Sequence, residues 1–207
     1  IGLTSWRFNI GAGSAGQGAD SDIKDEWRRA EGFLQANGSY DWTRQEGQRW
    51  FLQAAKRRGV DQFYGFVNSP PVALTRNGKA YSSGGSSANL PSEKYDTYVN
   101  FLCNVINHLE SEDNILLDYI SPVNEPQWDW SNAGQEGSPW TNSEIASLVK
   151  KLNSKLTELH MKTDIELPEA AQIEFLYKSH NHPGRDDQLK AFFTPGSVDY
   201  IGDLEKV

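Results

Sequence analysis

Cysteine is nearly absent from this sequence. The one thiol in 207 residues, Cys103, excludes an internal disulfide. It lies in the apolar helical pattern YVNFLCNVINHL, which favours a packed core residue over a nucleophile. Long apolar runs are also lacking, so no membrane span is expected, and no signal peptide is visible. Because the sequence begins at Ile1 within a strand-like run, we expect it to be part of a longer chain.

Positive charge is scarce as well. The 20 lysines and arginines against 28 aspartates and glutamates give a formal net charge of −8. This balance argues against a nucleic-acid partner, which needs a basic face, and against an anionic membrane surface. Near the expected strand ends the cations are Arg7 and Arg76, so a neutral substrate is favoured over an acidic one.

Strand-like and helix-like stretches alternate along the chain. Strands are expected over 1–10, 62–71, 115–123 and 163–170, and helices over 24–36, 43–58, 92–110, 141–161 and 186–193. Repeated strand–helix units at this spacing predict an α/β fold with a parallel sheet, either doubly wound or part of a (β/α) barrel.

Polar and aromatic residues gather where the expected strands end. They are, in chain order, Trp6, Arg7, Asn9, Asn68, Asn124, Glu125, Trp128, Glu169 and Gln172. Catalytic groups of a barrel come from the carboxyl ends of several strands, so this pattern favours the barrel.

No cofactor or metal is expected. The stretch GAGSAGQG lacks the acidic residue that a dinucleotide-binding motif places about 20 residues on. His180 and His182 have no cysteine partner and no HExxH pattern around them.

The stretch ISPVNEPQW, residues 120–128, resembles the Asn-Glu-Pro signature of retaining glycosidases built on (β/α)8 barrels. IGLTSWRFNIGAGS at the start resembles strand two of glycoside hydrolase family 30. The run from GAGSAGQG through KDEWRRAE and NSPP to NEPQWDW looks most like its endo-β-1,6-galactanase branch. The resemblance implies that residues 1–207 are an incomplete TIM-barrel catalytic domain carrying roughly strands two to five. Strand one, strands six to eight and an accessory β-domain would lie outside this sequence.

Retaining hydrolysis requires two carboxyl groups about 5 Å apart, one as acid/base and one as nucleophile. The resemblance implies that Glu125 is the general acid/base, and Asn124 is suited to bind the sugar 2-hydroxyl. Arg7 resembles the arginine that keeps the nucleophile ionised, although a structural ion pair is the alternative. Since the nucleophile of this clan follows strand seven, we expect it outside this chain. The 207 residues alone should then be inactive, and unstable or prone to associate through open sheet edges.

Other strand-end residues are candidates for sugar contacts. The amides of Asn9, Asn68 and Gln127 suit hydroxyl groups, and Trp128, with Trp130 as a second candidate, offers a flat apolar face. Glu169 is expected either to contact substrate or to bond another strand-end group. Trp6, Trp42 and Trp50 are expected to serve packing, with a sugar subsite as the alternative, and Trp27 is expected to serve packing. The polar loop 77–91, NGKAYSSGGSSANLP, is expected to rim the cleft, although its composition equally fits a surface loop with no such role.

Three functions are consistent with these residues. The first is a retaining endo-β-1,6-galactanase-like hydrolase, the second a hydrolase of β-1,6-glucan or xylan, and the third a non-catalytic carbohydrate-binding relative. By resemblance the protein would be secreted or held in the cell envelope, with a polysaccharide or oligosaccharide as its partner. Val72, Ala73 and Leu74 stand where relatives often carry aromatic or methionine side chains, so the exact substrate stays open.

Overall fold

The structure, a computed structural model, describes residues 2–207. Its centre is a four-stranded, fully parallel sheet in the order β1-β2-β3-β4, so each strand lies beside the next one in the chain. The strands are β1 (Ser5–Asn9), β2 (Gln62–Phe66), β3 (Tyr119–Ser121) and β4 (Asp164–Ile165). This order is the sequential arrangement of a barrel segment, and it confirms the expected α/β class.

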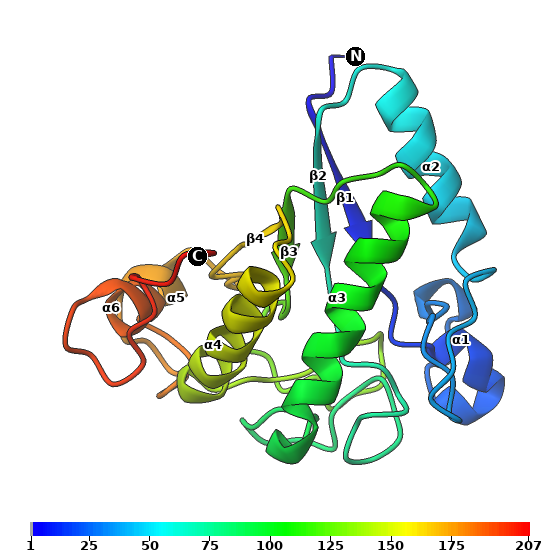
Figure 1. Ribbon diagram of the computed structural model, residues 1–207. Coiled ribbons are helices and arrows are strands. Elements are labelled where there is room, and N and C mark those ends of the chain that lie inside the picture. The colour runs from blue at the N-terminus through cyan, green and yellow to red at the C-terminus, as the bar shows by residue number, and fades with distance from the viewer. Residues whose placement is uncertain (1) are drawn as a thin grey trace.

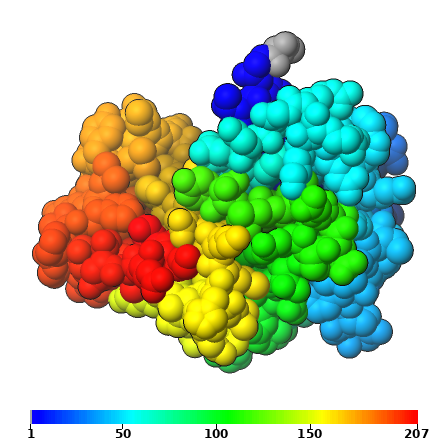
Figure 2. All heavy atoms as spheres, turned by 45° about the horizontal axis from the view of Figure 1, so that its top comes forward, coloured from blue at the N-terminus to red at the C-terminus, as the bar shows by residue number. Residues whose placement is uncertain are grey.

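Three long helices connect the strands: α2 (Glu46–Arg57), α3 (Tyr95–Ser111) and α4 (Asn142–Glu158). Figure 1 shows the strands all pointing the same way, with these helices ranged along the sheet and α1 (Ser14–Gln17) near the carboxyl ends. Figure 2 shows α2, α3 and α4 side by side in chain order on the surface. The short elements are the 3-10 turns η1 (Gly18–Ser21), η2 (Glu26–Arg28) and η3 (Ser92–Lys94), and helices α5 (Glu174–Tyr177) and α6 (Gln188–Phe193).

The two faces of the sheet differ in chemistry because successive strand side chains point to opposite sides. Phe8, Phe63, Ile120 and Ile165 belong to one buried apolar cluster with the helices. On the other face the sheet carries polar and aromatic groups. There the rings of Tyr64 and Tyr119 stack with their centroids 4.9 Å apart, level with Arg7 in the strand register.

Helix ends fix the loops that follow the strands. Thr141 and Glu144 form a reciprocal capping box at the start of α4. The Glu144 carboxylate also accepts from the backbone N–H of Ala88, at 3.1 Å. In α3, the buried Tyr98 donates its hydroxyl to the carbonyl oxygen of Pro122 at 2.8 Å. This bond ties α3 to the segment that leads into Asn124.

Four expected elements are wrong in extent. The predicted strand over 62–71 ends at Phe66, and the predicted strand over 115–123 is limited to Tyr119–Ser121. The predicted helix over 24–36 is only the single turn η2, and residues around it serve tertiary contacts instead. The predicted strand over 163–170 pairs only at Asp164–Ile165, because the chain turns away before Pro168, which has no N–H to donate to a ladder. Helix α5 was not predicted. None of the helices in residues 2–207 is long and apolar enough to cross a membrane.

Candidate functional site

Three strand-end residues from distant parts of the chain meet at the carboxyl edge of the sheet. Arg7 donates from Nη2 to Asn124 Oδ1 at 3.4 Å and forms an ion pair with the Glu169 carboxylate. Its guanidinium also lies 3.7 Å from the centroid of the Phe66 ring, a cation–π contact. The predicted meeting of residues from β1, β3 and the segment after β4 is therefore observed, and of the two options for Glu169 the structure shows a bond to another strand-end group.

The backbone of Glu125 is held on three sides. Its N–H donates to the carbonyl oxygen of Glu169 at 2.8 Å. Its own carbonyl oxygen accepts from the Trp128 N–H at 3.3 Å and from the Trp130 indole Nε1 at 3.1 Å. Glu125 has a φ of 43°, in the left-handed region that side chains other than glycine seldom adopt. Such strained backbone persists only where its surroundings impose it, and it clusters at functional sites.

The electrostatics around Glu125 favour its protonated form. Partial burial raises the pKa of the Glu125 carboxyl, the negative charge of Glu169 raises it further, and Arg7 opposes both effects. A carboxyl group that keeps its proton nearer neutral pH is suited to act as a general acid.

A third carboxyl group, Glu166, was not singled out by the sequence reasoning. Burial raises the pKa of Glu166, the charge of Glu169 raises it too, and Arg7 lowers it. Its backbone N–H donates to the carbonyl oxygen of Ile120 at 3.0 Å, directly beyond the ladder of β4. The signal was present in TDIELPEA, where Glu166 follows the last paired residue of the strand.

One predicted substrate contact needs correction. Gln127 is fully buried, with no exposed side chain. Its amide donates to the carbonyl oxygen of Arg185 at 2.6 Å and accepts from the N–H of Ala171 at 3.0 Å. Both ends of the amide are used within the protein, so Gln127 fixes loops and does not reach a sugar.

The other predicted contacts stay at the sheet edge. Asn9 and Asn68 lie side by side, and Asn68 Nδ2 donates to Asn9 Oδ1 at 3.5 Å. Trp128 is half-buried and packs edge-on against Phe175 and His182, with centroids 6.1 and 5.9 Å away. Trp130 is half-buried too, against the backbone of Gly137.

A buried carboxylate organises the loop after β1. Glu136 accepts from the backbone N–H of Ala12 at 2.9 Å, from that of Ser14 at 3.1 Å, and from the Ser14 hydroxyl at 2.6 Å. Burial raises the pKa of Glu136, while these donors lower it. No sequence pattern singles out this residue, because it lies in a polar loop, GQEGSP, with no regular period.

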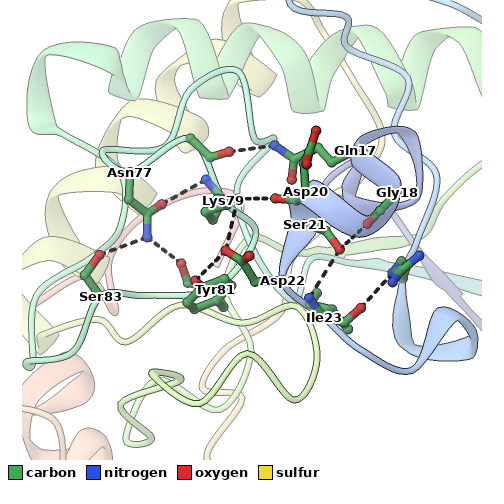
Figure 3. Close-up of polar contacts among 12 residues, drawn as sticks. Gln17, Gly18, Asp20, Ser21, Asp22, Ile23, Asn77, Lys79, Tyr81 and Ser83 are labelled. Carbon is green, nitrogen blue, oxygen red and sulfur yellow. Dashed lines mark hydrogen bonds and ion pairs between the residues drawn. The ribbon is translucent and has the colours of Figure 1, made fainter.

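The loop 77–91 is fastened to its neighbours, as Figure 3 shows. Gln17 donates to the Gly78 carbonyl oxygen at 2.7 Å, Lys79 pairs with Asp22 at 3.0 Å, and Tyr81 donates to Asp22 at 3.0 Å. The bonds from Lys79 and Tyr81 lower the pKa of Asp22. On its other side the loop accepts from Gly137 through the Ala80 carbonyl oxygen at 2.8 Å. The loops after β1, β2 and β3 thus form one connected wall.

The tryptophans divide into packed and exposed ones. Trp42 stacks on His108 with centroids 4.0 Å apart, and Trp6 stacks on Phe51 at 5.9 Å, as expected of packing residues. Trp27 contradicts the packing expectation, because 90% of it is exposed. Trp50 is 54% exposed and touches Phe51 edge-on.

The arrangement suits acid–base chemistry by carboxyl groups. Within residues 2–207 no cluster of three or more histidine, cysteine, aspartate or glutamate side chains is placed to hold a metal ion. His180 and His182 instead donate their backbone N–H groups to Asp186, at 2.7 and 3.3 Å. The groups that converge near Glu125 are a second carboxylate, a guanidinium and an amide, which can move a proton and bind hydroxyl groups.

Comparison with known proteins agrees with this geometry. A structure described as a conserved exported protein from Bacteroides fragilis is 33% identical, with a TM-score of 0.93 over 99% of this chain and 42% of that chain. The endo-beta-1,6-galactanase of Hypocrea rufa is 30% identical over 76% of this chain and 36% of its own length. The catalytic domain of xylanase C from Talaromyces cellulolyticus is 20% identical, with a TM-score of 0.63 over 91% of this chain and 41% of that chain, and shows the shared fold.

The chain spans 36% to 42% of the length of these relatives. Its sheet corresponds to part of the barrel of a catalytic domain in this group. Residues 1–207 match the profile of O-glycosyl hydrolase family 30 from end to end, and the chain belongs to that family.

Proposed function

We propose that this chain is part of the catalytic barrel of a retaining O-glycoside hydrolase of the endo-β-1,6-galactanase type, with Glu125 as its general acid/base. The observation that carries the proposal is the environment of Glu125. This carboxyl follows β3, its backbone is fixed by three hydrogen bonds, and burial together with Glu169 raises its pKa. Similarity to the Hypocrea rufa galactanase supports the choice of substrate.

The proposed reaction has two steps. In the first, protonated Glu125 gives its proton to the glycosidic oxygen while a second carboxylate attacks the anomeric carbon, so the leaving sugar departs neutral and a glycosyl-enzyme forms. In the second, ionised Glu125 removes a proton from water, whose oxygen attacks the anomeric carbon and releases the second carboxylate. We place that nucleophile outside residues 1–207.

The neighbouring groups have separate tasks in this scheme. Asn124, 3.4 Å from Arg7 Nη2, presents its amide beside the acid and would bind a sugar hydroxyl. Arg7 would hold negative charge at the sheet edge, as it does for Glu169. Trp128, Asn9 and Asn68 are proposed as further sugar contacts. The proposed roles of Glu169 are to form the ion pair with Arg7 and to raise the pKa of Glu125.

The test uses the complete protein that contains these residues. Glu125→Gln is compared with wild type by release of reducing ends from β-1,6-galactan, β-1,6-glucan and xylan. Loss of acid–base help should lower kcat on β-1,6-galactan by about 10²–10⁴-fold. Glu110→Gln, on the exposed side of α3, is the matched control and should keep full activity.

Three results would contradict the proposal. If wild type cleaves β-1,6-glucan or xylan but not β-1,6-galactan, the substrate is the cleaved polysaccharide and the galactanase assignment is wrong. Binding of sugar without cleavage by wild type identifies a carbohydrate-binding relative. Hydrolysis by residues 1–207 alone would overturn the placement of the nucleophile. Export of the protein, which the exported relative from Bacteroides fragilis favours, is tested by fractionating the source cells.

A further inference from the structure

A hollow of about 470 Å³ lies at the carboxyl ends of β1 and β2. We call it the Trp27 hollow and define it by Asn9, Trp27, Arg28, Arg29, Asn68 and Gln135. Its volume is in the range of small-molecule sites in proteins. We propose that the Trp27 hollow binds a pyranose unit of the substrate away from the bond that is cut, with Trp27 as the stacking platform.

Asn9 lines the hollow and belongs to β1, the strand that also carries Arg7. Asn9 and Arg7 point to the same side of β1, two residues apart, which separates them by about 7 Å along the strand. Arg7 in turn donates to Asn124, the neighbour of Glu125. A saccharide that crosses Glu125 can therefore run along the end of β1 and place a later ring in the hollow.

The Trp27 indole is exposed on a backbone that is held in place. The Trp27 N–H donates to Asp25 Oδ1 at 3.0 Å, which caps the turn η2. Arg28 Nη1 donates to Gln135 Oε1 at 2.7 Å, and Arg29 Nε donates to the Ile23 carbonyl oxygen at 2.8 Å. The turn thus presents a large apolar ring to solvent without the freedom of a loose loop, so little ordering entropy is lost when a ligand stacks on it.

The chemistry of the lining matches a pyranose ring. One face of such a ring carries C–H groups that pack on an indole, and its edge carries hydroxyl groups that need donors and acceptors. The amides of Asn9 and Asn68 supply both, and guanidinium groups supply N–H donors. Within residues 2–207, Arg28 and Arg29 form no ion pair with a carboxylate. Glu31, which also lines the hollow, is paired with Arg44 at 3.6 Å.

This inference rests on the proposed function, and its test separates the two. The complete protein is assayed on linear β-1,6-linked galacto-oligosaccharides of increasing length. Trp27→Ala should lower kcat/KM for the long oligomers by about tenfold, through KM, and should affect the shortest cleaved oligomer least. Trp27→Phe should restore most of the loss. Tyr177→Ala, which removes an exposed aromatic ring outside the hollow, should match wild type at every length.

Equal losses at every length, or no loss at any length, would overturn the subsite. A lowered melting temperature with an unchanged length dependence would mean that Trp27 packs against the rest of the protein. If wild type cleaves none of these oligomers, the proposed function fails. The subsite is then still tested by calorimetric titration of Glu125→Gln and Glu125→Gln/Trp27→Ala with the longest oligomer. A tenfold weaker Kd for the double variant supports the subsite, and equal Kd values refute it.

Discussion

The backbone N–H of Glu125 donates to the carbonyl oxygen of Glu169 at 2.8 Å, while the charge of the Glu169 side chain raises the pKa of Glu125. The segments after β3 and β4 are therefore joined by a backbone bond, and the charge on one of them sets the protonation of the other. Arg7 closes the group from β1 through its ion pair with Glu169. The protonation of the proposed acid thus depends on residues from three strands of the sheet.

Glu169→Gln should shift the pH dependence of hydrolysis. The charge of Glu169 raises the pKa of Glu125, so its removal lowers that pKa and also frees Arg7, whose effect has the same sign. Glu125 then loses its proton at lower pH, and the alkaline limb of the kcat/KM profile should move to lower pH. The measurement is the full pH–rate profile of both proteins. An alkaline limb that stays in place, or moves upward, would disprove the coupling.

Gly137→Ala should disturb Glu125 from a distance. A Cβ at position 137 would lie 2.2 Å from Cδ2 of Trp130, so the indole must move. The Glu125 carbonyl oxygen would then lose its indole donor and keep only the Trp128 N–H. We expect the free energy of unfolding to fall by about 1–3 kcal/mol, as in other overpacked sites, together with a lower kcat.

Calorimetry and steady-state kinetics check both effects of Gly137→Ala. Gly16→Ala is the matched control, because a Cβ there meets nothing within 4 Å. An unchanged kcat in Gly137→Ala would show that the Trp130 contact does not position the acid.

Ser14→Ala should weaken the loop after β1. The Ser14 hydroxyl donates to the buried Glu136 carboxylate at 2.6 Å and accepts from the Ala30 N–H at 3.2 Å. Because the variant removes one of the donors to the buried Glu136 carboxylate and the acceptor of the Ala30 N–H, the free energy of unfolding should fall by about 1–3 kcal/mol. Chemical denaturation measures the change. Ser154→Ala on the exposed side of α4 should be close to neutral, and equal stability of the two variants would contradict the assignment.

Glu136 should give the stability a pH dependence. Its pKa in the fold is raised above the ordinary value of 4.5, so the folded state holds this proton more tightly than the unfolded chain. Protonated Glu136 therefore adds to the free energy of unfolding. This contribution is complete at pH values below the pKa of Glu136 in the unfolded chain and is lost as pH rises through its pKa in the fold. Wild type should therefore lose unfolding free energy over that window, and Glu136→Gln should lose less. Denaturation series across pH test this, and parallel curves would refute it.

Periodicity predicted the long helices well. The apolar residues repeat at helical spacing over 43–58, 92–110 and 141–161. In these stretches the helix propensity of the residues and the burial of the apolar face favour the same structure. Helices α2, α3 and α4 therefore form close to the expected bounds. The stretch 24–36 has a similar pattern, yet tertiary contacts prevail there. A Cβ at Gly32 would lie 2.8 Å from the Cα of Gly13, so the backbone at 32 is packed directly on the loop after β1. A sequence pattern carries no information on such close approach.

The site residues that lie at the carboxyl ends of strands could be predicted from the sequence. Arg7, Asn124, Glu125 and Glu169 follow from the rule that parallel strands bring their carboxyl ends to one edge. The prediction that Gln127 contacts a sugar was wrong, because its burial depends on Arg185 and Ala171, both more than 40 positions away. Glu136 was missed for the same reason, since its partners Ala12 and Ser14 are 124 and 122 positions away.

The bonds between Gln17, Asp22, Lys79 and Tyr81 have a consequence for how this wall can change over evolutionary time. These contacts hold the loop after β1 and the loop after β2 together, and each loop supplies one partner of every contact. Replacing either one alone leaves Lys79 or Asp22 without its counterpart. A chimera that takes these loops from a relative should therefore fold well only when both loops are exchanged together. Relatives in which one loop has changed should show a compensating change in the other.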